Sequence, residues 1–115
     1  MKEQFKKIME DILDKKIHKL EGLTQFTKLK YTDEEKAKEA LKELAKSDFI
    51  DKFGEIADIL SPYIIGDKED EYFKYLINKG EEEFLIEVLM RNKNIVTRDN
   101  AEYKINEFKK RLDIF

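Results

Sequence analysis

The chain has 115 residues and a formal net charge of −3, a length that fits one domain able to bury roughly two-thirds of its unfolded surface. Hydrophobic residues make up 41% of it and charged residues 43%, with four glycines and one proline. So few helix breakers argue against a β-sandwich and against a disordered chain. The absence of cysteine excludes a disulfide framework and favours a cytoplasmic protein. No apolar run approaches the roughly 18 residues of a membrane span, so we expect a soluble protein.

The first helix is predicted to run from Phe5 to Leu20, because apolar residues recur there at helical spacing. Gly22 is placed to end this helix. Residues 23–31 are harder to assign, because apolar residues recur at every third position. A short helical turn is favoured there over a strand or a loop.

A helical hairpin is predicted over residues 33–60. A capping box that begins at Thr32 starts its first helix, whose buried face contains Ala37, Ala40, Leu41, Leu44 and Ala45. Ser47 or Asp48 caps its second helix, and Pro62 stops it. The apolar residues of that second helix are Phe49, Ile50, Phe53, Ile56, Ala57 and Leu60. A loop this short makes the two helices antiparallel or steeply crossed.

A second hairpin is predicted over residues 67–91. Gly66 precedes its first helix and Gly80 closes it, with Tyr72, Phe73, Leu76 and Ile77 on the inner face. A last helix then begins at its cap residue, Thr97. Its apolar face contains Ala101, Ile105, Phe108 and Leu112.

Helix 81–91 is expected to be the central helix of the fold. It opens with three glutamates and closes with a basic residue, which complements the helix dipole. Glu83, Glu87 and Arg91 fall four residues apart and form one narrow polar stripe. The rest of its surface is large and apolar, and a helix of this kind is buried.

The predicted fold is all-α, a single compact domain of five or six helices over residues 1–115. The hairpins 33–60 and 67–91 start about 34 residues apart and resemble the units of HEAT or armadillo α-solenoids. That resemblance rests on hairpin length and implies HEAT-like stacking of the hairpins. Two generic antiparallel hairpins in a bundle explain the same spacing and are the favoured interpretation.

The residues that could act in catalysis or bind a metal do not form a recognisable site in the sequence. His18 is the only histidine, too few for a di-iron or zinc site in a chain without cysteine. Ser47 and Ser61 both stand at helix boundaries, where capping explains them. The acidic run at residues 67–71 is explained more simply as a helix start than as a metal site. We therefore predict no catalytic, cofactor-binding or metal-binding residue, and an enzyme of unknown type is the third interpretation.

A nucleic-acid-associated accessory protein is the second interpretation, based on the basic residues of the terminal helices. In the last helix these are Arg98, Lys104, Lys109, Lys110 and Arg111. A helix-turn-helix around Ser47 is disfavoured, because its second helix would present four acids, Asp48, Asp51, Glu55 and Asp58, to phosphate.

The first interpretation is a non-enzymatic protein-binding module, a small inhibitor, immunity-type protein or adaptor. Residues 32–97 contain ten basic and seventeen acidic residues, a net charge of −7, which suits docking on a basic partner. The candidate partner-binding residues are Glu69, Asp70, Glu71, Glu81, Glu82, Glu83, Tyr63 and Ile64. A solvated surface is the alternative for the acids, and inward packing is the favoured alternative for the apolar segment 62–65.

Overall fold

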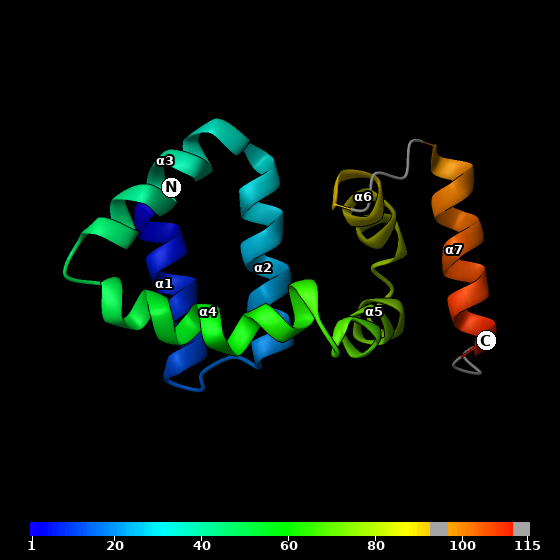
Figure 1. Cartoon of the computed structure of the whole chain (residues 1–115), viewed down its shortest axis with the longest axis horizontal. Coiled ribbons are helices and arrows are strands. Elements are labelled where there is room, and N and C mark those ends of the chain that lie inside the picture. The colour runs from blue at the N-terminus through cyan, green and yellow to red at the C-terminus, as the bar shows by residue number, and fades with distance from the viewer. Residues whose placement is uncertain (93–96, 112–115) are drawn as a thin grey trace. The chain divides into compact units, whose positions relative to one another are not determined.

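The computed structural model describes residues 1–92 and 97–111. This part of the chain forms seven helices and contains no strand (Figure 1), so the predicted all-α class is confirmed. Seven helices replace the predicted five or six, because residues 19–32 form a full helix where only a short helical turn over residues 23–31 was favoured. The chain divides into two compact units, Met1–Asp70 and Glu71–Phe115. The prediction of one domain, with or without stacked hairpins, stays a prediction.

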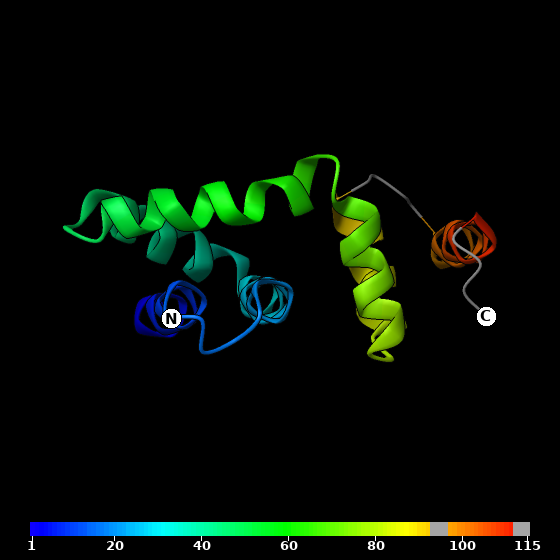
Figure 2. The ribbon, with the colours of Figure 1, turned by 90° about the horizontal axis from the view of Figure 1, so that it is seen from below.

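The first unit contains four helices. They are α1 (Lys2–Leu13), α2 (Lys19–Thr32), α3 (Glu34–Lys46) and α4 (Ile50–Ile65). Helix α1 packs against each of the other three, and α4 covers one side of α1 and α2 (Figure 2). The core between them includes Phe5, Met9, Leu23, Leu44 and Leu60. The rings of Phe5 and Phe26 are 5.0 Å apart and join α1 to α2.

The predicted helix from Phe5 to Leu20 is wrong, because α1 ends at Leu13. Lys15 takes a left-handed conformation with φ of 58°, and its N–H donates to the carbonyl of Ile12. The N–H of Lys16 donates to the carbonyl of Asp11, which completes the paired bonds of a Schellman motif. Glycine usually takes that left-handed position, so a lysine there gave no recognisable stop signal.

Gly22 does not end a helix; it lies inside α2. A Cβ atom added at Gly22 would lie 2.5 Å from Cδ1 of Ile12, so the missing side chain lets α1 and α2 approach closely. Residues 23–31, left between a turn, a strand and a loop, are helical within α2.

The predicted capping box at Thr32 is also wrong. Thr32 is the last residue of α2, and its hydroxyl donates to the carbonyl of Lys28. Asp33 caps α3 instead, because its carboxylate accepts the N–H of Lys36 at 3.1 Å. Both Thr32 and Asp33 are common capping residues, and the preceding helix decides which of them is free to cap.

The connection from α3 to α4 is short, as predicted, and the two helices diverge from it (Figure 1). The predicted cap of α4 at Ser47 or Asp48 is wrong, because Phe49 is its N-cap and no side chain caps it. Ser47 ends α3 instead; its hydroxyl donates to the carbonyl of Leu44 and accepts the N–H of Phe49 in the connection. Pro62 does not stop α4, which continues to Ile65. The carbonyl of Pro62 accepts the N–H groups of Gly66 and Lys68, and these bonds close the helix three residues later.

The second unit contains α6 (Glu82–Asn92), α7 (Arg98–Arg111) and most of α5 (Glu69–Asn78). Helices α5 and α6 lie side by side as the predicted hairpin (Figures 1 and 2), and Gly80 joins them with φ of +74°. The rings of Phe73 and Phe108 pack edge to face, with centroids 5.6 Å apart. Thr97 accepts the N–H of Asn100, as its predicted capping role requires. Leu112 lies outside the described residues.

Helix α6 is buried as predicted. Its run of buried side chains is Phe84, Leu85, Ile86, Val88 and Leu89. Met90, which follows this run, exposes its large apolar side chain. Helix α6 packs against α7 and forms the interior of the second unit. Its central position in the whole chain stays a prediction.

Candidate functional site

Two of the predicted acidic residues at the start of α6 are bonded to α7. The carboxylate of Glu83 accepts two hydrogen bonds from the guanidinium of Arg98, one of them at 2.9 Å from Nη1. These bonds, with the charge of Arg98, hold the pKa of Glu83 below its usual value. Glu82 forms an ion pair with Lys109. The structure therefore places α7 cations against charges that were predicted to face a partner.

The other predicted acids stand at the start of α5. Because α5 and α6 run antiparallel, Glu69, Asp70 and Glu71 lie at the opposite end of the hairpin from Glu81 (Figure 2). Glu69, Asp70 and Glu81 each have interaction partners of their own. The acids at residues 69–71 and 81–83 thus form two groups, and the structure does not bring them into one patch.

Tyr63 and Ile64 take opposite positions at the end of α4. Tyr63 is only 2% exposed, and the ammonium groups of Lys19 and Lys68 lie 5.4 and 5.6 Å from the centroid of its ring. Its hydroxyl is buried with no hydrogen-bond partner in the described part of the chain. Ile64 is 51% exposed and Ile65 is 79% exposed. Inward packing therefore holds for Tyr63 and is wrong for the two isoleucines.

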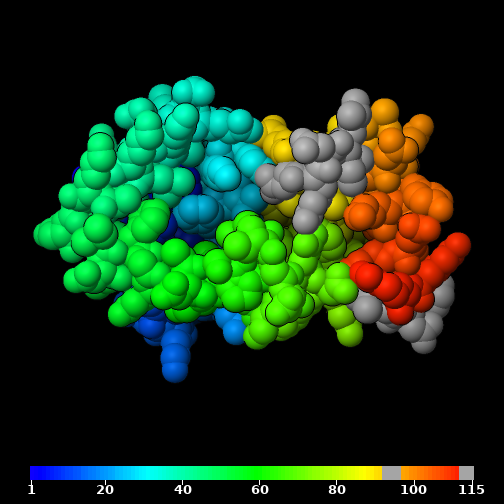
Figure 3. Space-filling view, in the orientation of Figure 1, coloured from blue at the N-terminus to red at the C-terminus, as the bar shows by residue number. Residues whose placement is uncertain are grey.

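Helix α4 carries an exposed face that the sequence interpretation assigned to the core. Ile50 is 54% exposed, and Gly54 and Ala57 are exposed beside it. With the half-buried Ser61 and the exposed Ile64, these residues follow one line along the helix, which we call the α4 seam. A Cβ atom at Gly54 would meet no atom within 4 Å, so the fold does not require glycine there. Figure 3 shows α4 (green) at the surface of its unit.

Three acids lie beside the α4 seam. Asp51, Glu55 and Asp58 are exposed and recur at spacings of four and three residues, so they form one stripe, here called the acidic edge. Among the described residues, none of the three takes part in an ion pair or a side-chain hydrogen bond. The sequence already showed these acids as a surface that repels phosphate, but it did not select them as a binding site.

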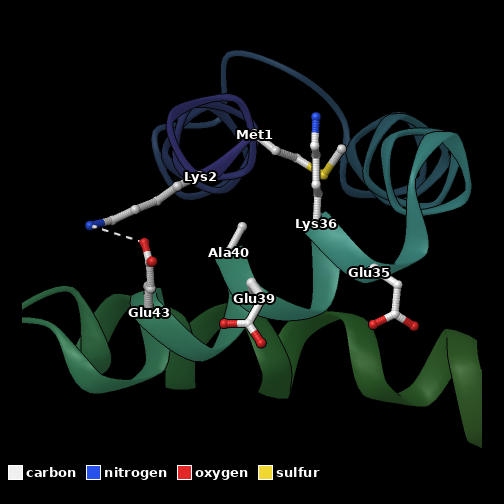
Figure 4. Close-up of a pocket in the computed structure, with 7 residues that line it drawn as sticks. All are labelled: Met1, Lys2, Glu35, Lys36, Glu39, Ala40 and Glu43. Carbon is white, nitrogen blue, oxygen red and sulfur yellow. Dashed lines mark ion pairs between the residues drawn. The ribbon is translucent and has the colours of Figure 1, made fainter.

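A groove of about 410 Å³ opens between the start of α1 and α3 (Figure 4). It is lined by Met1, Lys2, Glu35, Lys36, Glu39, Ala40 and Glu43. Lys2 lies 3.9 Å from Glu43, whereas the carboxylates of Glu35 and Glu39 point away from α1 (Figure 4). The groove contains no nucleophile or imidazole, and its acids do not converge on one point.

His18 and the basic residues of α7 also have structural roles. The imidazole Nδ1 of His18 accepts the N–H of Leu20 at 3.2 Å and caps α2. Arg98 bonds Glu83 and Glu102, and Lys109 pairs with Glu82. These contacts reduce the net positive charge that α7 presents, and the nucleic-acid interpretation stays a prediction.

The described residues contain no group of three or more side chains placed to hold a metal ion. No helix within them combines the length and the hydropathy of a transmembrane segment. Comparison of the chain with known protein families, with curated proteins and with solved structures finds no match in any of the three. The geometry of the surface is therefore the basis for any functional proposal.

Proposed function

We propose that this chain is a non-enzymatic protein-binding module that docks a basic partner through the α4 seam and the acidic edge. It acts as an adaptor or an inhibitor, by occupying a surface on that partner. The lack of cysteine is consistent with a cytoplasmic protein. The observation that carries the proposal is an exposed apolar line bordered by acids that have no partner within the described chain.

The exposed apolar side chains of the α4 seam favour association with a partner. Ile50 and Ile64 are each about half exposed, and contact with a partner would remove their apolar area from water. Two exposed isoleucines on one helix face are unfavourable in water, and a partner that covers this face would remove that unfavourable contribution. The acids supply selectivity, because they attract a cationic surface and repel an anionic one.

The same charges disfavour two other partner classes. Nucleic acid presents a dense row of phosphates, and the acidic edge opposes it. A membrane with anionic headgroups is opposed for the same reason. A protein with lysines or arginines beside an apolar patch fits both parts of the surface.

Affinity purification from cells that naturally produce the protein, with and without nuclease treatment, tests this proposal. We expect a protein partner whose recovery survives nuclease and decreases as the salt concentration rises. A partner lost on nuclease treatment would favour the nucleic-acid interpretation instead.

Two charge-matched triple variants locate the contact. Asp51→Asn, Glu55→Gln and Asp58→Asn together should slow association with the purified partner and weaken its salt dependence. Glu81→Gln, Glu82→Gln and Glu83→Gln remove the same number of charges and should leave association unchanged while lowering stability, because Glu82 and Glu83 bond α7. If the second variant slows association and the first does not, the originally predicted acids are the site.

A further inference from the structure

We infer that the occupant of the α4 seam is a single amphipathic α-helix of a partner protein, with a large apolar side chain at its centre and basic residues along one edge. This inference rests on the proposed function and names the kind of structure that binds. The seam residues Ile50, Gly54, Ala57, Ser61 and Ile64 are spaced by four, three, four and three residues. That alternation is the spacing by which one helix contacts another along its length.

The size of the seam residues indicates where the partner helix comes closest. Gly54, Ala57 and Ser61 are small and stand between the larger Ile50 and Ile64. Small residues allow two helix backbones to approach, and the larger residues at the ends pack around the incoming helix. The distance from Ile50 to Ile64 along α4 is about 21 Å, or roughly four helical turns, which sets the contact length.

Gly54 is the most informative of these residues. A glycine inside a helix lowers stability relative to alanine. The fold offers no reason for that loss at Gly54, because an added Cβ would point into open space. Close approach of a second helix supplies a reason.

The acidic edge determines the charge of the partner helix and excludes a second copy of this chain. Asp51 and Asp58 each follow a seam residue by one position, so they flank the contact on one side. In an antiparallel pair of α4 helices, these acids would face their own copies and repel each other. In a parallel pair these acids would face residues 53 and 60 of the other copy. Leu60 is buried in the core of that copy, so it offers these acids no contact. A helix with lysine or arginine at the facing positions has neither problem.

The test uses a synthetic peptide of about 18 residues, capped at both ends, with leucines on one helical face and lysines along one edge. A scrambled peptide of the same composition and a peptide with glutamate for every lysine are the comparison ligands. Binding to the full chain is measured by fluorescence anisotropy. We expect the amphipathic basic peptide to bind and both comparison peptides to bind at least about tenfold more weakly.

Variants of the chain then locate the peptide. Gly54→Leu should weaken binding by about tenfold or more, because the added side chain blocks close approach, and its Cβ atom would have no atom of the fold within 4 Å. Asn106→Leu adds the same side chain at an exposed position of α7 and should bind the peptide as the natural chain does. Asp51→Asn with Asp58→Asn should weaken binding and reduce its salt dependence.

The possible outcomes separate this inference from the proposed function. If the acid variant weakens binding but Gly54→Leu does not, the acidic edge is a binding surface and the helix inference is wrong. If neither variant weakens binding, the proposed function fails as well. Equal binding of the scrambled peptide would show attraction by charge alone and would overturn the helix inference. Binding of the chain to phosphatidylserine vesicles, or a dimer in sedimentation that Gly54→Leu dissociates, would assign the seam to a membrane or to a second copy.

Discussion

Helices α4 and α6 both carry more apolar residues than one buried stripe requires, and they differ in what surrounds the excess. In α6 the run from Phe84 to Leu89 is covered, apart from Glu87, and that residue pairs with Arg91 at 3.0 Å. In α4 the apolar Ile50 and Ile64 stay exposed, and the nearby acids have no partner in the described chain. Apolar side chains are therefore available to a partner only where the neighbouring helices do not cover them. The composition of a helix alone does not show which of its side chains are covered.

The largest expected difference between the two helices is in the free energy of unfolding after truncation of one apolar side chain. Leu85 in α6 is fully buried, so Leu85→Ala should lower that free energy by roughly 2–5 kcal/mol. Ile50→Ala in α4 should change it by less than about 0.5 kcal/mol, because the side chain is half exposed. Urea titration followed by circular dichroism measures both values. Similar losses for the two variants would show that α4 is covered in solution.

The two mid-helix glycines sharpen the same contrast, with effects of opposite sign. Gly22→Ala should lower stability by about 1 kcal/mol or more, because the new Cβ would press on Ile12. Gly54→Ala should raise stability by about 0.5–1 kcal/mol, because its Cβ enters open space and alanine favours a helix. Thermal and urea unfolding report both changes.

A double variant provides the control for Gly22. In an Ile12→Ala background the side chain that Gly22→Ala would displace is gone, so the same substitution should no longer destabilise the chain. A loss that persists in this background would mean that contact with Cδ1 of Ile17, 3.3 Å from the added Cβ, or the backbone itself requires glycine in α2, and that contact with Ile12 does not.

The elements that sequence predicted well depend on local signals. The buried run of α6, the end at Gly80 and the cap at Thr97 all follow from residues within one helix and its ends. The missed boundaries depend on contacts or on unusual conformations. Lys15 adopts a left-handed backbone that usually takes glycine, and Gly22 is explained only by the approach of α1 to α2.

The candidate site was harder to predict than the fold, for a related reason. The acids Glu82 and Glu83 are conspicuous in the sequence, but only the packing of α7 shows that cations lie against them. The periodicity of α4 places Ile50 and Ala57 close to the apolar face, and the arrangement of α1, α2 and α3 leaves them outside it. A pattern gives the direction of a side chain, whereas the neighbouring elements decide whether that direction is covered.

The smallest expected effect concerns the ionisation of Glu83, which tests whether the acids of α6 are already occupied. The hydrogen bonds from Arg98 lower the pKa of Glu83, so Arg98→Ala should return that pKa towards its usual value in an NMR titration of the carboxyl carbon. Glu102→Gln is the matched control, because it removes the negative charge of the other partner of Arg98 and leaves the bonds to Glu83 in place. A carboxylate with a lowered pKa stabilises the folded state above its unfolded pKa, and the contribution is lost as the pH falls through the folded pKa. The stability difference between the natural chain and Glu83→Gln should therefore be constant near neutral pH and shrink in acid. If Glu83 titrates at the same pH with and without Arg98, the pair does not persist in solution, and the start of α6 becomes available to a partner in the same way as the acidic edge of α4.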